Sequence, residues 1–169
     1  MEPCWEEPES LEPIQISYGQ KKPEEETYRL RALRNGPRRT RTPLYVLERT
    51  YSVADMYMTH RVIATQSIVN YLQGNPFGRG LLQSVLHDLF WCLLDWRLPP
   101  EIVMTLAYVY IDPDTSEPRP AIRVHIPRHA ALSWLDFWTD LEERAYQHVD
   151  FASVLIFVRR IDYGSTSIP

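Results

Sequence analysis

The stretch of sequence best suited to binding chemistry is a run of arginines. Five of them fall within eleven residues, namely Arg31, Arg34, Arg38, Arg39 and Arg41. A guanidinium presents its N–H donors in a planar fork that matches carboxylate and phosphate groups. The run therefore predicts contact with an anion, and the surrounding sequence has to indicate which anion.

Charge is distributed unevenly around this run, although the whole chain has a net charge of -4. Residues 1–27, the acidic arm, contain eight glutamates and two lysines, whereas residues 28–49 contain seven arginines and one glutamate. The predicted basic patch comprises Lys21, Lys22, Arg29, Arg31, Arg34, Arg38, Arg39 and Arg41. Three interpretations stay open: pairing with the acidic arm, contact with a nucleic-acid backbone, and attraction to an anionic membrane, to which each basic residue contributes about 1 kcal/mol.

A second binding feature is expected at a segment bounded by glycine and proline. It consists of Asn75, Pro76, Phe77 and Gly78, which we predict to form a loop with Phe77 at its tip. An exposed aromatic side chain there would serve membrane contact or self-association. The alternative is that Phe77 folds back onto the core.

The sequence offers no catalytic or metal-binding set of residues. His125 and His129 are four apart, but Pro127 between them prevents a helical pair of ligands. Ser84 and His87 are three apart with no orienting third group. The six glycines form no phosphate-binding motif. We therefore expect a protein that is not an enzyme, with no metal, no cofactor and no small-molecule substrate.

Cellular context is indicated by the cysteines and the apolar segments. Two cysteines, Cys4 and Cys92, predict no disulfide framework and favour a reducing compartment. The first ten residues lack the apolar run of a signal peptide. The most apolar stretch, 81–96, is interrupted by polar and acidic residues, which favours a buried helix over a membrane span. Any membrane contact is expected to be peripheral.

Hydrophobic periodicity predicts the elements that must position these groups. Strands are expected at 26–33, 104–111, 121–126 and 151–161, and helices at 43–57, 79–95 and 130–147, while 61–72 fits either state. The strands 104–111 and 121–126 could pair as a hairpin. In the latter, Arg123 and His125 lie on the opposite face from Ile122, Val124 and Ile126. The expected fold is α+β: one compact domain over 28–169, with a small antiparallel sheet packed by about three helices, behind a disordered arm over 1–27.

Residues 54–76, ADMYMTHRVIATQSIVNYLQGNP, resemble the centre of rhabdovirus matrix proteins. In that family an acidic residue and a tyrosine, then His-Arg, precede an apolar segment that ends in a Gly- and Pro-containing loop. The matching positions are Asp55, Tyr57, His60, Arg61 and 74–76. The order of the later elements also matches, so the resemblance covers about residues 28–160.

The resemblance implies a structural protein that self-associates, binds anionic lipid of the inner membrane surface and the viral nucleocapsid, and supports virion assembly and budding. Its expected locations are the virion, the host cytoplasm and the inner face of host membranes, with the nucleus added for some relatives. Two features depart from the family: the acidic arm contains no Pro-Pro-x-Tyr motif, and it lacks a lysine-rich start. The alternative is a small regulatory protein that binds a host protein or RNA through the arm and the basic patch.

Overall fold

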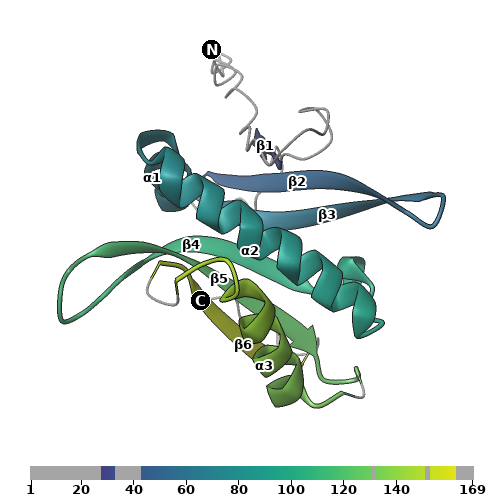
Figure 1. Cartoon of the computed structure of the whole chain (residues 1–169). Coiled ribbons are helices and arrows are strands. Elements are labelled where there is room, and N and C mark those ends of the chain that lie inside the picture. Colours follow the sequence, from purple (N-terminus) through teal and green to yellow (C-terminus); the bar gives the residue numbers. More distant parts are fainter. Residues whose placement is uncertain (1–27, 33–42, 131, 151–152, 163–169) are drawn as a thin grey trace, which may run out of the picture.

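The computed structural model describes residues 28–32, 43–130, 132–150 and 153–162, and Figure 1 shows how their elements are arranged. The acidic arm lies outside these residues. So do six members of the predicted basic patch, Lys21, Lys22, Arg34, Arg38, Arg39 and Arg41. Arg29 and Arg31 are therefore the two patch residues whose positions can be described.

Six strands form one sheet in the order β1-β2-β3-β4-β5-β6. Their bounds are Arg29–Ala32, Leu44–Val53, Met56–Thr65, Met104–Ile111, Pro118–Pro127 and Leu155–Ile161. Three neighbouring pairs are antiparallel, but β3–β4 and β5–β6 are parallel. The α+β class is confirmed, and the sheet is mixed because helices connect each parallel pair of strands. The antiparallel hairpin expected from strands 104–111 and 121–126 is confirmed as β4–β5.

The predicted helix at 43–57 is wrong, because this segment contains β2, the turn that follows it and the first two residues of β3. It pairs with β3 over ten residue pairs, from Leu44↔Thr65 to Val53↔Met56. Ala54 and Asp55 connect the two strands with φ values of 46° and 63°. Two successive positive φ angles are the mark of the tight turn whose twist matches a β-hairpin. The long ladder therefore overrides the helical spacing of the apolar residues.

The ambiguous segment 61–72 contains both states, since β3 ends at Thr65 and helix α1 spans Gln66–Gly74. The Thr65 hydroxyl oxygen accepts a hydrogen bond from the Ile68 N–H at 3.4 Å and so caps the helix. A β-branched strand end and a helix cap are compatible roles for threonine, which explains why neither pattern excluded the other.

The predicted loop at 75–78 is wrong, because helix α2 spans Pro76–Asp95 and begins inside it. Asn75 is the cap, and its Oδ1 accepts from the Gly78 N–H at 2.8 Å. Pro76 occupies the first helical position, where its missing N–H costs nothing. Gly78 lies against Tyr71 of α1, and a Cβ there would be 2.8 Å from Tyr71 Cε1. A side chain at position 78 would therefore require the Tyr71 ring to shift.

The other predicted helices are confirmed with adjusted ends, as α2 and as α3, Trp134–Ala145. Figure 1 shows α2 and α3 lying over one face of the sheet. The buried core lies between these layers. It includes Val62, Leu86, Phe90, Ile122 and Phe137, whose side chains are all 0 % exposed. A short 3-10 helix, η1, Pro100–Ile102, leads into β4. Among the described helices, none is long and apolar enough to cross a membrane.

Candidate functional site on the open face of the sheet

The strands have a second face, which no helix of the described chain covers, and we call it the open face. Residue pairing places one side chain from every strand in a single row on this face. The row runs Arg31, Val46, Ile63, Leu106, Arg123 and Phe157. Because alternate residues of a strand share a face, the row identifies the other members of the open face.

Arginine dominates the charge of the open face. Its arginines are Arg29, Arg31, Arg61, Arg119, Arg123 and Arg159. Glu48 is the single carboxylate among the described strand residues. Helices α2 and α3, on the opposite side, carry six acidic residues and two arginines. The open face is therefore basic and the helical side is acidic, although the net charge of the whole chain is negative.

On the β1–β3 half of the open face, three arginines surround one glutamate. Arg61 Nε lies 2.8 Å from Glu48 Oε2, and Arg31 Nη1 lies 3.5 Å from Glu48 Oε1. Arg29 is directly opposite Glu48 in the strand pairing. The side chains of Arg31 and Arg61 are each 70 % exposed. One carboxylate cannot neutralise three guanidinium groups, so this half keeps a positive charge that is open to solvent.

The β4–β6 half carries aromatic side chains between its arginines. The rings of Tyr110 and Phe157 approach each other with centroids 6.1 Å apart. The Arg123 guanidinium lies 5.1 Å from the centre of the Tyr108 ring, and its Nη2 donates to the Tyr108 hydroxyl at 3.3 Å. Ala121, which is fully buried, lies directly opposite Tyr108 in the pairing. These contacts fix the positions of the rings on the sheet.

The pKa of His125 reflects burial and the positive charge of this half of the open face. Burial lowers the pKa of His125 from 6.5, and the positive charges of Arg123 and Arg159 lower it further. The polarity of this strand face could be predicted from the alternation of residues 121–126. The sequence could not predict that this strand face lies on the same surface as Arg31 and Arg61, because that depends on the order of the strands in the sheet.

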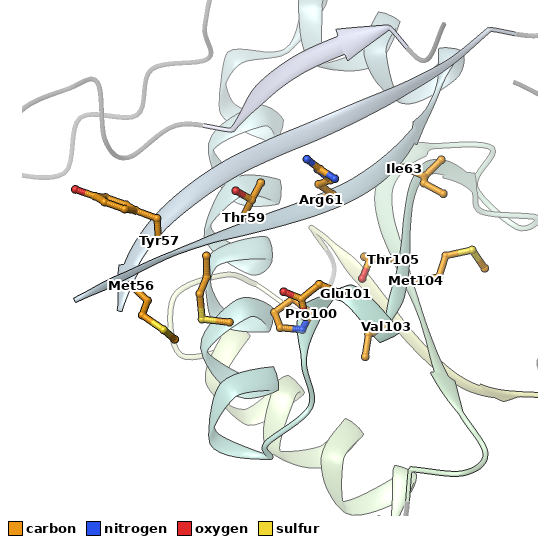
Figure 2. A pocket seen from close by; sticks show the side chains of 11 residues that line it. Met56, Tyr57, Thr59, Arg61, Ile63, Pro100, Glu101, Val103, Met104 and Thr105 are labelled. Carbon is orange, nitrogen blue, oxygen red and sulfur yellow. The ribbon is translucent and has the colours of Figure 1, made fainter. Parts of the chain in front are cut away.

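A cleft opens where β3 and β4 separate, as Figure 2 shows. These strands pair only at Ile63–Leu106 and Ala64–Ala107. The cleft has a volume of about 620 Å³, and its charged lining residues are Arg61 and Glu101. At its hairpin end, Met56 and Tyr57 are 63 % and 83 % exposed. The lining contains no pair of groups arranged as nucleophile and base.

Phe77, the predicted apolar contact, is 75 % exposed but lies in the first turn of α2. It belongs to the helical layer, so the structure does not bring it together with Arg29 and Arg31. Asn75, Pro76 and Gly78 have the structural roles described above. Tyr57 was identified from the sequence only as part of the resemblance and not as a contact residue, although its exposed ring follows the hairpin turn and shares the open face with Arg61.

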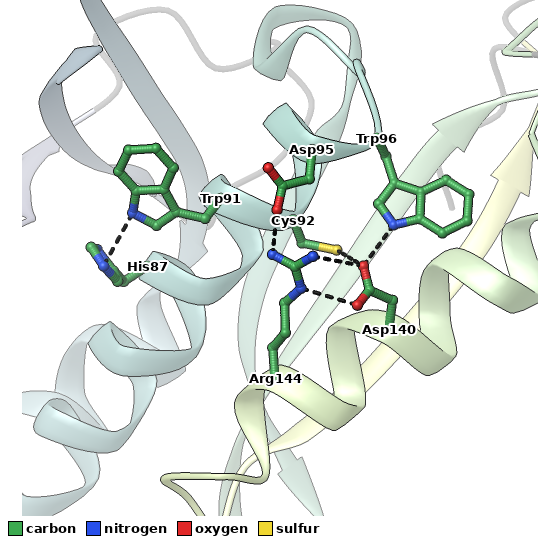
Figure 3. Close-up of polar contacts among 7 residues, drawn as sticks. All are labelled: His87, Trp91, Cys92, Asp95, Trp96, Asp140 and Arg144. Atoms are coloured by element: carbon green, nitrogen blue, oxygen red, sulfur yellow. Dashed lines mark hydrogen bonds and ion pairs between the residues drawn. The ribbon is translucent and has the colours of Figure 1, made fainter. Parts of the chain in front are cut away.

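A polar cluster joins α2 to α3 (Figure 3), and its geometry is that of a structural joint. Asp140 accepts from Trp96 Nε1 at 2.7 Å and from Arg144 at 3.0 and 3.1 Å, while Arg144 Nη1 also lies 2.6 Å from Asp95 Oδ2. Burial and the neighbouring Asp140 raise the pKa of the Cys92 thiol far above its usual range. Cys92 therefore stays protonated and is a poor nucleophile.

Replacement of Asp140 tests this joint. Asp140→Ala removes the shared acceptor of Trp96 and Arg144, so we expect the free energy of unfolding to fall by about 1–3 kcal/mol. Asp95→Ala is the matched control, because Asp95 is 60 % exposed and forms an ion pair with Arg144 but does not bind Trp96. It should cost less than about 1 kcal/mol. Urea unfolding measures both, and equal losses would contradict a joint centred on Asp140.

No group of three or more metal-ligating side chains comes together in the described part of the chain. Comparisons of the sequence and structure with protein-family models, curated proteins and solved structures found no match.

Proposed function

We propose that this chain is a non-enzymatic, matrix-type assembly protein that binds anionic membrane through the open face. The observation that carries the proposal is the charge of this face: six arginines and one carboxylate on described strands, opposite acidic helices. A broad basic surface is attracted to anionic lipid headgroups, at about 1 kcal/mol for each basic residue near the membrane.

The tip of the β2–β3 hairpin supplies an apolar contact beside this charge. Tyr57 lies on the open face and Met56 precedes it, and both side chains are largely exposed. An aromatic ring with a polar tip is suited to the interface between headgroups and acyl chains. In the proposal this pair replaces Phe77 as the membrane-contacting residues.

The assembly role rests on the resemblance in residues 54–76. In this proposal the protein self-associates beneath a viral envelope, contacts the nucleocapsid and supports budding, with residues 1–27 available to host partners. The locations follow: the virion, the host cytoplasm and the inner face of host membranes. The membrane step is the part that the residues of the open face allow us to test directly.

Co-sedimentation with phosphatidylserine-containing vesicles tests the membrane step. Arg29→Glu/Arg61→Glu reverses two exposed charges of the open face. Removal of two attractions of about 1 kcal/mol each weakens binding by about thirtyfold, and the reversed charges weaken it further. Wild-type binding should also fall as salt rises, and neutral vesicles should not pellet the protein.

The matched control is Arg97→Glu/Arg128→Glu, which changes the net charge equally at two exposed positions outside the strands. It should bind nearly as well as the wild type. The proposal is wrong if the wild type ignores anionic vesicles at low salt, or if the two double variants lose binding equally. Circular dichroism verifies that each variant is folded.

A further inference from the structure

The β4–β6 half of the open face places aromatic rings beside its arginines, and the membrane proposal does not use these rings. Tyr108 and Tyr110 are two residues apart on β4, so their side chains lie on one face at roughly 7 Å. Phe157 of β6 reaches Tyr110 across β5, with ring centroids 6.1 Å apart. The small, buried Ala121 lies opposite Tyr108 on the strand between them. Three rings thus surround one small residue on a sheet surface.

Positive charge is interleaved with these rings. Arg123 is in register with Phe157, and Arg159 follows Phe157 by two residues on the same face. Arg159 is exposed, and no ion pair holds it within the described residues. Arg119 lies 3.5 Å from Asp112 and 3.6 Å from Glu117, so its charge is partly neutralised.

The strands themselves contain nothing to cancel this charge. β4, β5 and β6 include no aspartate or glutamate. The depressed pKa of His125 is consistent with this, since the charges of Arg123 and Arg159 contribute to it. A ligand on this surface is therefore expected to be anionic and to offer flat groups to the rings.

Single-stranded nucleic acid has both properties. Its phosphates pair with guanidinium groups, and its bases stack on aromatic rings or on a guanidinium plane, such as that of Arg123 above Tyr108. A double helix offers no free base faces to an open sheet. A lipid bilayer favours side chains that protrude, whereas Tyr108, Tyr110 and Phe157 are all only partly exposed and lie against their neighbours.

We propose that the open face of β4–β6 binds single-stranded nucleic acid, with bases stacked on Tyr108, Tyr110 and Phe157 and phosphates held by Arg123 and Arg159. The phosphate contacts position the strand, and the stacking tolerates any base, so sequence preference is expected to be weak. The site shares Arg123 and Arg159 with the proposed membrane surface, but its stacking rings lie on β4 and β6, away from Arg29 and Arg61 on β1 and β3. Loss of a ring therefore separates nucleic-acid binding from membrane binding.

Fluorescence anisotropy with a labelled twelve-nucleotide oligouridylate tests the proposal on the full chain. The wild type should bind at low salt. Phe157→Leu keeps an apolar side chain on the sheet but removes the ring, and we expect about tenfold weaker binding. Arg159→Gln should weaken binding and reduce the slope of log affinity against log salt by about one. Because Arg159 is exposed, this variant is informative even if Phe157→Leu folds poorly.

Two controls separate a stacking platform from general attraction. Phe77→Leu removes an exposed aromatic ring from the helical layer and should leave oligonucleotide affinity unchanged. Arg29→Glu/Arg61→Glu should lose vesicle binding while Phe157→Leu retains it. The proposal is overturned if the wild type does not bind at low salt, if Phe77→Leu weakens binding as much as Phe157→Leu, or if Phe157→Leu and Arg159→Gln impair vesicle binding but not oligonucleotide binding.

Discussion

Tyr28→Ala is expected to lower the free energy of unfolding by about 3–5 kcal/mol, in the range measured for removal of a buried aromatic ring. Tyr28 directly precedes β1 and is 0 % exposed. Its ring meets Tyr51 and His60 edge-on, at centroid distances of 6.5 and 5.8 Å. The loss should be measured by urea unfolding, followed by circular dichroism and tryptophan fluorescence.

The Tyr28 hydroxyl contributes separately, and Tyr28→Phe isolates it. This hydroxyl donates to the Leu86 carbonyl at 3.0 Å, and it lies 2.7 Å from His60 Nδ1 and 3.0 Å from Tyr51 Oη. Its removal leaves three buried polar groups short of a partner, which should cost about 1–3 kcal/mol. The hydroxyl thus links the residue before β1 to β2, β3 and α2 through hydrogen bonds.

Tyr57→Ala is the control for both variants, because Tyr57 is 83 % exposed. Exposed substitutions of this kind usually change stability by no more than about 0.5 kcal/mol. If Tyr28→Ala is no more harmful than Tyr57→Ala, β1 is not anchored to the domain. In that case Arg29 and Arg31 would not be fixed on the open face, and the membrane proposal would lose two of its cations.

The elements that were predictable are those whose own residues carry the pattern. Helix α2 has apolar residues at three- and four-residue steps along its whole length, and β4 and β5 alternate clearly. The helix predicted at 43–57 was wrong because the spacing of its apolar residues fits both a helix and a strand. Leu47 and Tyr51 are four apart, as on a helix, but both also lie on the inner face of β2. The deciding factor was pairing with β3, which is a tertiary interaction.

The hairpin turn was also hidden from sequence reasoning. Ala54-Asp55 adopts two positive φ angles without the Asn-Gly or Asp-Gly pair that usually signals such a turn. Likewise, Asn75-Pro76 suggested a loop, whereas asparagine as cap and proline at the first helical position suit a helix start. The same residue types occur in loops and at helix ends. Here they begin helix α2, which packs against α1 where Gly78 meets Tyr71.

The candidate site was predictable only in fragments. Arg29 and Arg31 were identified as basic residues, and Arg123 as the polar side of a strand. Their place in one surface depends on strand order and register, which link residues more than ninety positions apart. The matrix-type function remains a prediction that rests on the resemblance and on the charge of the open face.

Acidification should destabilise the protein through His60. This side chain is 2 % exposed, and burial lowers its pKa from 6.5 to about 4. Between these values the unfolded chain binds a proton at His60 that the folded chain does not, so stability falls as pH falls. The full contribution is present above pH 6.5 and is lost by about pH 4. The gap between the two pKa values corresponds to about 3 kcal/mol.

His60→Gln isolates this effect, because glutamine does not titrate and its amide can still hydrogen-bond to the Tyr28 hydroxyl. Urea unfolding at pH 7, 5.5 and 4.5 should show the variant less stable than the wild type at neutral pH, with the difference shrinking as the pH falls. Other titrating groups, such as His125, are shared by both proteins and cancel in the difference. A difference that stays constant with pH would mean that His60 has the same pKa folded and unfolded. Burial would then not keep it neutral, and the contact with Tyr28 would have to persist with a charged imidazole.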